Sequence, residues 1–333
     1  MINYYNLKFI FKWFFKPKLK YGTGAFRDRP DSRDRLLKAV IGEVKVDWEK
    51  GYNVESDLGI QLKVENQDGS SSCVGQAWAK YTEAIDCAET GKSPDHSAKS
   101  IYEQIYIPGG GAYLKDGAKA IVKGGVALEE LIPSYENGNP PSEDYMTSQT
   151  ISNDVRECMK VYRAKEYRFV SSSDVDLLAW TIANNHGAVS GADGDNAGWQ
   201  TGEIKNPKKR EWGHAFYFTG FGLVPGRGRY LDFINSWSEQ WGFSGKGRFY
   251  LDEYDIAQWT YGAWTLIDLP NFMQSNVKII KDKNSTACGI WLPATCPAAL
   301  ESYCANFGLE VPKTPNGDID WEKWISGELE LKK

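Results

Sequence analysis

The stretch Asn66-Gln67-Asp68-Gly69-Ser70-Ser71-Ser72-Cys73-Val74-Gly75-Gln76-Ala77-Trp78-Ala79 joins a polar loop to an alanine-rich run at a cysteine. The run that follows predicts a helix from Cys73 to Thr90, with the cysteine in its first turn. A thiol at that position faces unpaired backbone N–H groups and the positive end of the helix dipole, which lower its pKa. A lone cysteine is more often a buried apolar residue than a nucleophile, so partners are needed elsewhere in the chain.

Two downstream segments contain such partners. Gly213-His214-Ala215-Phe216-Tyr217-Phe218-Thr219-Gly220-Phe221-Gly222 places a histidine at the start of an apolar run bounded by glycines, which predicts a buried strand. Phe233-Ile234-Asn235-Ser236-Trp237-Ser238-Glu239-Gln240-Trp241-Gly242-Phe243 places an asparagine at the end of a second apolar strand. The reactive side chains therefore follow the order Cys, His, Asn.

These segments resemble the papain-like cysteine peptidases (family C1), in the style of their bacterial and phage members. Gln67 to Cys73 matches the motif Gln-x(5)-Cys, Gly213-His214-Ala215 matches Gly/Asn-His-Ala, and Asn235 to Gly242 matches Asn-Ser-Trp-x-x-x-Trp-Gly. The resemblance extends from about Val46 to Leu269. It implies an α+β, two-lobe papain-like fold, with a helical left lobe, a β-barrel-like right lobe and the active-site cleft between them.

The resemblance also implies roles for four residues. Cys73 is the expected nucleophile, His214 the base, Asn235 the group that orients the imidazole, and Gln67 an oxyanion donor together with the Cys73 backbone N–H. We therefore expect a cysteine endopeptidase that acts on peptides or proteins through a thioester acyl-enzyme. No cofactor and no metal are expected.

Six further residues are expected at the substrate cleft because they match cleft positions of the family. Trp237 would shield the bond between histidine and asparagine, Gly213 would leave space in a specificity pocket, and Ser71 stands where relatives have glycine. The substrate preference stays open at this point. The expected cleft residues are Ser71, Ser72, Gly110, Gly111, Gly213 and Trp237.

The other two histidines have simpler interpretations. His186 precedes Gly187 at a predicted helix C-terminus, where a cation suits the helix dipole. His96 lies in a loop before a helix and is expected to be solvated or to neighbour a helix cap.

The N-terminal segment has a composition of its own. Residues 1–38 hold ten Lys and Arg against three Asp, and residues 1–20 are rich in aromatic side chains. Lys8, Lys12 and Lys16 interrupt every apolar run, so we expect neither a secretory signal nor a membrane span there. The spacing predicts docking on a membrane surface or a protein groove, or packing on the chain's own domain. Residues 1–45 are interpreted as an arm or a short pro-like segment.

The remaining chain divides into a catalytic domain and an appendage. We predict a papain-like domain at 46–269, with a helical lobe at about 66–160 and a strand-rich lobe at about 161–269. Residues 270–333 would form a small appendage that binds an assembly partner. The net charge of −5 gives no indication of nucleic acid binding. Helices are expected at Cys73–Thr90, Leu114–Val122 and Val175–Asn185, and strands at Ala215–Phe221, Tyr230–Asn235, Lys246–Leu251 and Ala263–Ile267.

The cysteines favour a location that is not strongly oxidising. Ser70 stands where secreted relatives have a disulfide cysteine, and none of the other cysteines falls at a family bridging position. Cys288, Cys296 and Cys304 are spaced by eight residues, which fits no zinc motif. We therefore favour a cytoplasmic or virion-associated protein over a secreted one.

Two other functions stay open. One is a catalytically silent papain-like scaffold or virion component, since folds are reused without their chemistry. The other is a Cys-His amidase that cuts peptidoglycan crosslinks, because unrelated folds use the same pair.

Overall fold

The computed structural model describes residues 21–91 and 93–267, the backbone of 278–281 and 288–291, and residues 313 and 315–316. The predicted docking segment at 1–20 and most of the predicted appendage lie outside the described residues. Within 270–333, β10 (Lys278–Lys281) and β11 (Cys288–Trp291) form an antiparallel pair.

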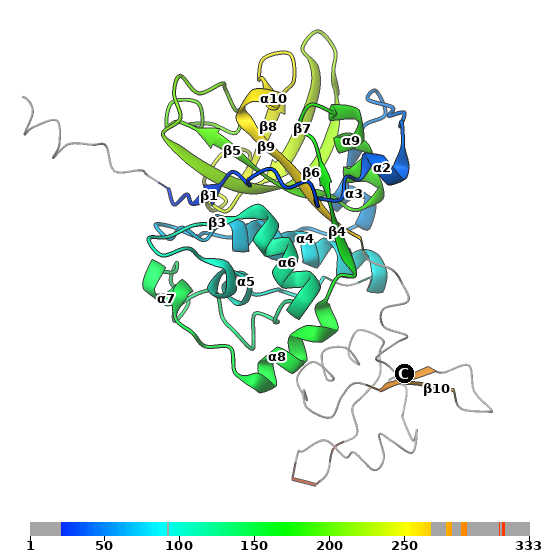
Figure 1. Cartoon of the computed structure of the whole chain (residues 1–333), viewed down its shortest axis with the longest axis vertical. Helices are drawn as coiled ribbons and strands as arrows, with labels where there is room; N and C mark the ends of the chain where they lie inside the picture. Colours follow the sequence, from blue (N-terminus) through cyan, green and yellow to red (C-terminus); the bar gives the residue numbers. More distant parts are fainter. Residues whose placement is uncertain are drawn as a thin grey trace, which may run out of the picture.

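The upper lobe in Figure 1 is a seven-stranded sheet. Its strands follow the order β4-β9-β5-β6-β7-β8, and β2 pairs with β6 beside this path. All six strands along that path pair antiparallel with their neighbours. The strands are β2 (Tyr52–Asn53), β4 (Glu166–Val170), β5 (Ala188–Gly194), β6 (Trp212–Val224), β7 (Gly228–Ile234), β8 (Lys246–Tyr250) and β9 (Thr260–Ile267).

The sheet contains the strands that the sequence predicts, and in the described part of the chain it does not close into a barrel. Among the described residues no pairing joins β4 to β8, so these two strands remain the edges of an open sheet. The short helices α9 (Val175–Asn184), α10 (Ile256–Trp259), α2 (Lys38–Ile41) and α3 (Val54–Leu58) lie around it. The overall fold is α+β, as expected.

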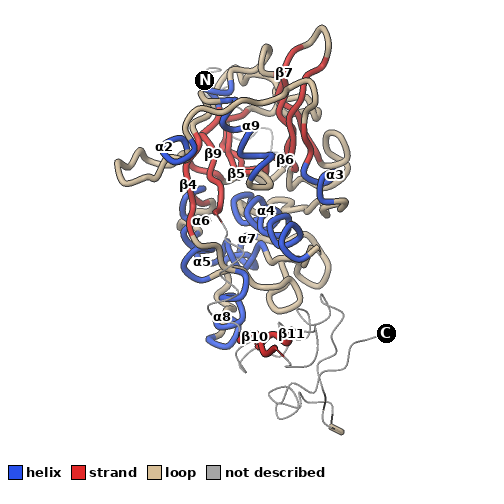
Figure 2. Tube along the Cα trace, turned by 90° about the vertical axis from the view of Figure 1, so that its right-hand side faces the viewer, coloured by secondary structure: helices blue, strands red, loops and turns tan. Residues whose placement is uncertain are grey.

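The lower lobe is helical and contains α4 (Cys73–Thr90), α5 (Ala98–Ile105), α6 (Leu114–Gly124), α7 (Glu143–Thr147), α8 (Asn153–Met159) and the short 3₁₀ turn η1 (Lys160–Tyr162). Helix α4 has the predicted bounds. It ends at Gly91, whose left-handed φ of 75° suits glycine. Figure 2 shows α4 at the junction between the helices and the sheet. This position explains why the helix is buried over most of its length.

Val46-Asp47-Trp48, where the resemblance to the family begins, is loop and turn. The pairing with the sheet is made a few residues later, where Tyr52 and Asn53 of β2 lie opposite Phe221 and Gly220 of β6. Trp48 is held by its side chain instead, because its indole N–H donates to the Asp176 carboxylate at 2.8 Å.

The described N-terminal segment runs between the lobes and along the sheet, as the dark blue ribbon of Figure 1 shows. Its strand β1 (Ala25–Phe26) pairs parallel with β3 (Ala112–Tyr113), which precedes α6. Farther along, the Leu37 backbone N–H donates to the Phe169 carbonyl of β4 at 2.9 Å. We call residues 21–41 the arm.

Asp28 anchors the arm to both lobes. Its carboxylate accepts from the Trp264 indole N–H at 2.7 Å and from the Lys115 backbone N–H, in the first turn of α6, at 3.2 Å. The Lys115 ammonium in turn pairs with Asp31 and Asp34. Burial raises the pKa of Asp28 to about 6, and the hydrogen bonds from Trp264 and Lys115 oppose that shift.

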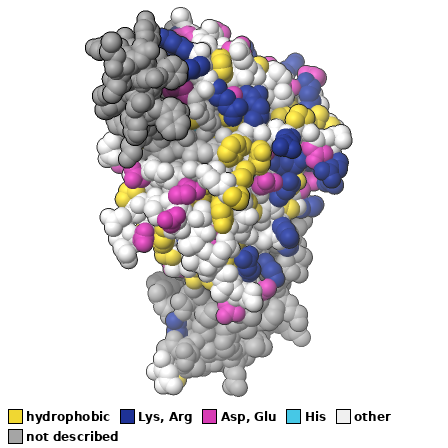
Figure 3. Space-filling model, turned by 60° about the vertical axis from the view of Figure 1, so that its left-hand side comes forward, with side chains coloured by type: hydrophobic (Ala, Val, Ile, Leu, Met, Phe, Trp, Pro, Cys, Tyr) yellow, Lys and Arg dark blue, Asp and Glu magenta, His cyan; other side chains and the backbone are white. Residues whose placement is uncertain are grey.

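Figure 3 shows that one face of the molecule has a band of exposed hydrophobic side chains with lysine and arginine beside it. The exposed large hydrophobic residues of the described chain are Phe26, Leu36, Val40, Ile41, Leu223 and Phe243. Four of these six belong to the arm, so the arm buries its backbone against the lobes while it exposes apolar side chains outward.

Two findings bear on location. No helix in the described part of the chain is both long and apolar enough to cross a bilayer. Cys73 and Cys87 are free thiols, whereas Cys158 is disulfide-bonded although it does not fall at a family bridging position.

Asp28 makes the stability of the docked arm depend on pH. Because its pKa is raised from 3.8 to about 6, its contribution is fully present below about pH 4 and is lost as the pH rises through about 6. We expect Asp28→Asn to remove this dependence. From pH 4 to pH 7 the wild-type chain should lose about 2 to 3 kcal/mol of unfolding free energy relative to the variant.

Urea unfolding at stepped pH measures this difference. Asp154→Asn is the control, because Asp154 is an exposed carboxylate in the first turn of α8 and is not among the charges that act on Asp28. If the difference in unfolding free energy between the wild-type chain and Asp28→Asn is the same at every pH from 4 to 7, the raised pKa of Asp28 is contradicted.

Candidate active site

Cys73 is the first residue of α4 and is completely buried. Its sulfur lies against the backbone N–H of Ala215, the residue that follows His214 on β6. Burial raises the pKa of the thiol to about 12, while the N–H groups of Ala215, Val74 and Cys73 itself oppose that shift. Cys73 therefore lies against the strand that contains the predicted base, and no hydrogen bond joins its sulfur to His214 Nδ1 in the described part of the chain.

His214 and Asn235 are joined by a short hydrogen bond. His214 is the third residue of β6, and Asn235 directly follows β7, which pairs with β6. The imidazole Nε2 lies 2.6 Å from Asn235 Oδ1. The Ser236 backbone N–H donates to the same Oδ1 at 2.8 Å, which identifies that amide atom as oxygen.

This bond fixes the form of the imidazole. Because an amide oxygen can only accept, Nε2 of His214 must hold the proton, and Nδ1 has the free lone pair of a base. Nδ1 has no hydrogen-bond partner among the described residues. Burial lowers the pKa of His214 to about 3, and the bond to Asn235 opposes that shift.

Trp237 covers the imidazole. The two rings lie 4.3 Å apart between centroids at an interplanar angle of 31°, and Trp199 and Trp212 add edge-on contacts to His214. These aromatic rings surround the bond from His214 to Asn235 with apolar surface. In such surroundings a hydrogen bond is stronger than in water.

Gln67 is buried beside the thiol loop with its amide held at both ends. Its Oε1 accepts from the Ser236 hydroxyl at 2.5 Å, and its Nε2 donates to the Ser70 carbonyl at 2.8 Å. One N–H of Nε2 therefore remains for a ligand. Sequence reasoning did not single out Ser236, although it stands inside the Asn-Ser-Trp motif.

Glu143 connects the loop that contains Ser71 to the loop that contains Gly111. Its carboxylate accepts from the Ser71 backbone N–H at 2.5 Å and from the Tyr102 hydroxyl at 2.6 Å. The Tyr102 hydroxyl accepts from the Gly111 backbone N–H at 2.7 Å. Neither Glu143 nor Tyr102 was predicted, because no local motif marks them and only the fold brings them to the cleft.

The remaining predicted cleft residues divide into two groups. Gly110 faces Ser71, since a Cβ at Gly110 would lie 2.8 Å from the Ser71 hydroxyl oxygen. Ser72 is completely buried instead, and its hydroxyl bonds to that of Ser70 at 2.8 Å. The expectation that Ser72 lines the cleft stays a prediction.

The first residues of the arm contact the predicted cleft residues directly. Tyr21 stacks on Trp237, with ring centroids 4.9 Å apart, and the Trp237 indole N–H donates to the Gly22 carbonyl at 2.7 Å. The Gly24 N–H then donates to the Gly213 carbonyl at 2.9 Å, and its carbonyl accepts from Ala112 N–H at 2.8 Å. The arm thus occupies the cleft between the predicted lining residues Gly213 and Gly111.

Two glycines make this passage possible. A Cβ at Gly22 would lie 2.2 Å from the Ser70 carbonyl oxygen and 2.9 Å from Gln67 Nε2. A Cβ at Gly24 would lie 2.4 Å from the Ser71 carbonyl oxygen. The backbone therefore approaches the thiol loop more closely than any residue with a side chain could.

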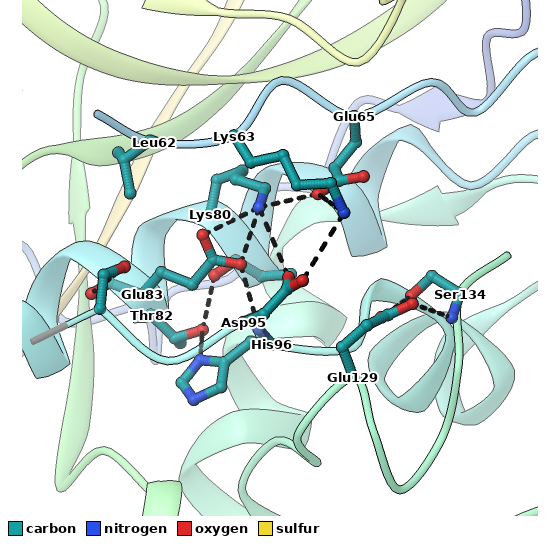
Figure 4. Close-up of polar contacts among 12 residues, drawn as sticks. Leu62, Lys63, Glu65, Lys80, Thr82, Glu83, Asp95, His96, Glu129 and Ser134 are labelled. Atoms are coloured by element: carbon teal, nitrogen blue, oxygen red, sulfur yellow. Dashed lines mark hydrogen bonds and ion pairs between the residues drawn. The ribbon is translucent and has the colours of Figure 1, made fainter. Parts of the chain in front are cut away.

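Behind α4 lies a cluster of buried charges, drawn in Figure 4. The Lys80 ammonium pairs with the carboxylates of Glu83 at 2.8 Å and Glu65 at 2.9 Å, and all three residues are buried. The Glu65 carbonyl also accepts from the Ser238 N–H at 2.9 Å. The cluster therefore links α4 to the segments that hold Gln67 and Asn235.

His96 directly precedes Ser97, the N-cap of α5, which confirms the predicted position beside a helix cap, but it is buried in this cluster and not solvated. Its Nδ1 lies 2.8 Å from the Thr82 hydroxyl (Figure 4). Its Nε2 lies 3.1 Å from the Asp86 carboxylate. His186 follows the end of α9, as predicted, with a left-handed φ of 55°. Burial lowers its pKa, so a neutral ring is favoured there over the expected cation.

No group of three or more His, Cys, Asp or Glu side chains in the described part of the chain could hold a metal ion.

Removing the Lys80 charge should destabilise the chain strongly. Lys80→Met leaves the Glu65 and Glu83 carboxylates buried without their shared cation, and we expect a loss of about 3 to 5 kcal/mol in unfolding free energy. Lys63→Met is the matched control, because Lys63 pairs with the same Glu65 from a side chain that is 55% exposed. It should cost less than about 1 kcal/mol. If urea unfolding shows that both variants lose the same small amount of unfolding free energy, this account of the cluster is contradicted.

Comparison with known proteins shows the family of the chain. The family described as papain family cysteine protease matches residues 44–260. No curated protein gives a significant match. Among solved structures, xylellain, a cysteine protease from Xylella fastidiosa, is 23% identical with a TM-score of 0.62, covering 77% of this chain and 99% of its own.

Two proenzymes have similar folds. Procathepsin B from Trypanosoma congolense is 14% identical with a TM-score of 0.56, covering 74% of this chain and 87% of its own. A digestive procathepsin L from the larval midgut of Tenebrio molitor is 20% identical with a TM-score of 0.56, covering 75% and 79%. These likenesses show the fold, and the family match covers well over half of the chain. The chain belongs to the papain family of cysteine proteases.

Proposed function

We propose that the chain is a cysteine endopeptidase that hydrolyses peptide bonds with Cys73, His214, Asn235 and Gln67. The observation that carries the proposal is the buried 2.6 Å bond from His214 Nε2 to Asn235 Oδ1, on the strand whose Ala215 N–H lies against the Cys73 sulfur. It leaves a lone pair on Nδ1 as the base that a thiol nucleophile requires.

In the proposed reaction, Nδ1 of His214 takes the thiol proton and the Cys73 sulfur attacks the peptide carbonyl carbon. The oxyanion accepts from Gln67 Nε2 and from the Cys73 backbone N–H. The intermediate collapses to a thioester as the imidazolium protonates the leaving amine. Water, deprotonated by Nδ1, then hydrolyses the thioester, which releases the acid and restores the thiol.

We further propose that the described state is latent, with the arm as a short pro-like segment. The arm covers the cleft, and burial favours the neutral thiol and the neutral imidazole through the raised pKa of Cys73 and the lowered pKa of His214. The Gly22 and Gly24 carbonyls are already bonded to Trp237 and Ala112. Two similar structures are proenzymes by name, which supports a latent form here.

The domain division, partners and location remain predictions. The division at 45 and 269, docking by residues 1–20 and assembly through 270–333 rest on composition. A cytoplasmic or virion-associated location rests on the cysteine pattern, and the disulfide at Cys158 weighs against a strongly reducing one.

The test uses a full-length variant that lifts the arm. The double substitution of Gly22→Val and Gly24→Val adds side chains that clash with the Ser70 and Ser71 carbonyl oxygens. We call this chain the arm-displaced variant. We expect it to cleave casein at least about tenfold faster than the wild-type chain, because an opened cleft admits substrate. Gly69→Val is the matched control, since a Cβ there meets nothing within 4 Å.

An epoxide that traps papain-like thiols gives the second readout. It should label the arm-displaced variant, and adding Cys73→Ala should abolish both labelling and turnover. Labelling that survives Cys73→Ala would contradict the nucleophile assignment. A properly folded arm-displaced variant that neither turns over casein nor reacts with the epoxide would favour the silent scaffold. Turnover of cell-wall peptides without casein would favour the amidase.

A further inference from the structure

A buried carboxylate lies next to the cleft at the end where the arm leaves it. Asp193, on β5, is only 7% exposed. Its Oδ1 accepts from the Tyr261 hydroxyl at 2.6 Å and lies 2.9 Å from the Arg210 Nε. Its Oδ2 lies 3.4 Å from Nη2 of Arg27, which belongs to the arm. The two oxygens therefore have different partners, and the arm supplies the one at Oδ2.

Arg27 is bound by more than this one contact. Its Nη2 also donates to the Gln258 carbonyl at 3.2 Å, and its guanidinium carbon lies 4.9 Å from the centre of the Tyr261 ring. A carboxylate, a carbonyl and an aromatic ring together suit a planar, delocalised cation better than a compact ammonium. The arrangement is thus a site for an arginine side chain.

The site is continuous with the cleft. A Cβ at Gly213 would lie 2.2 Å from the Ala25 carbonyl oxygen of the arm and 2.3 Å from the Tyr261 hydroxyl. The arm backbone at Ala25 therefore lies beside Tyr261, and the side chain two residues farther along reaches Asp193. A peptide that replaces the arm in the cleft would pass the same carboxylate.

We propose that Asp193, Tyr261 and the Gln258 carbonyl form a specificity site for an arginine side chain of the peptide substrate, and that Arg27 occupies this site while the arm is docked. This inference deepens the proposed function by naming a substrate class. Arg210 does not take the place of the ligand, because it lies at the opposite carboxylate oxygen, Oδ1. Removal of the arm leaves Oδ2, the Gln258 carbonyl and the Tyr261 ring face for an incoming guanidinium.

The experiment measures binding, so that it does not depend on turnover. The arm-displaced variant is combined with Arg27→Gln, which empties the site, and with Cys73→Ala, which prevents reaction. Fluorescent alanine-leucine hexapeptides with one arginine, placed at each position in turn, are compared with peptides that have neutral citrulline instead. At one or two positions we expect arginine to bind about tenfold more tightly, as a charge-assisted bond to a buried carboxylate implies.

Two added substitutions assign the preference to this site. Asp193→Asn should bring the affinities of the arginine and citrulline peptides within about twofold of each other, since only the charge is lost. Glu211→Gln is the control, because Glu211 is a partly exposed carboxylate two residues before Gly213 that faces Lys209; it should leave the preference unchanged. If Asp193→Asn fails to fold, Tyr261→Leu removes the ring below the guanidinium and should weaken the preference.

The outcomes separate this inference from the proposed function. Equal affinity for arginine and citrulline at every position overturns the arginine site, even if the arm-displaced enzyme cleaves casein. An arginine preference that Asp193→Asn leaves intact also overturns it. An arginine preference that depends on Asp193, in a chain whose arm-displaced form cleaves nothing, supports the site and rejects the peptidase assignment.

Discussion

The hydrogen bond between His214 Nε2 and Asn235 Oδ1 is the interaction on which the rest of the site depends. It fixes the proton on Nε2 and leaves Nδ1 as a base. The bond requires the pairing of β6 with β7, the Ser236 N–H that holds the amide oxygen, and the Trp237 ring that covers the imidazole. Because Ser236 also holds Gln67, the base and the expected oxyanion donor share one support.

The positions of the proposed triad residues in the fold could be predicted from the sequence because each stands in a short motif at a fixed place in a strand or helix. Cys73 begins its predicted helix, and His214 and Asn235 lie at the predicted strands. What could not be predicted depends on contacts between distant segments. Glu143 reaches Ser71 across 72 positions, and His96 is buried by packing that its own loop does not reveal.

The contacts of the arm with the cleft could not be predicted from the sequence either. Its composition indicated a separate segment, but no local pattern indicated that Gly22 and Gly24 pass between the two walls of the cleft. Their lack of side chains allows the backbone to lie against Ser70 and Ser71. The covering has an electrostatic consequence as well as a steric one, because removing water from the Cys73 thiol and the His214 imidazole disfavours the charged form of both.

The most direct test of the central claim is the pH dependence of Cys73 alkylation by iodoacetamide in the arm-displaced variant, with and without Asn235→Ala. If the imidazole held by Asn235 ionises the thiol, alkylation should already be fast near pH 6, and Asn235→Ala should move the rise toward the ordinary cysteine pKa of about 8.5. Identical profiles that both rise near pH 8.5 would contradict the account.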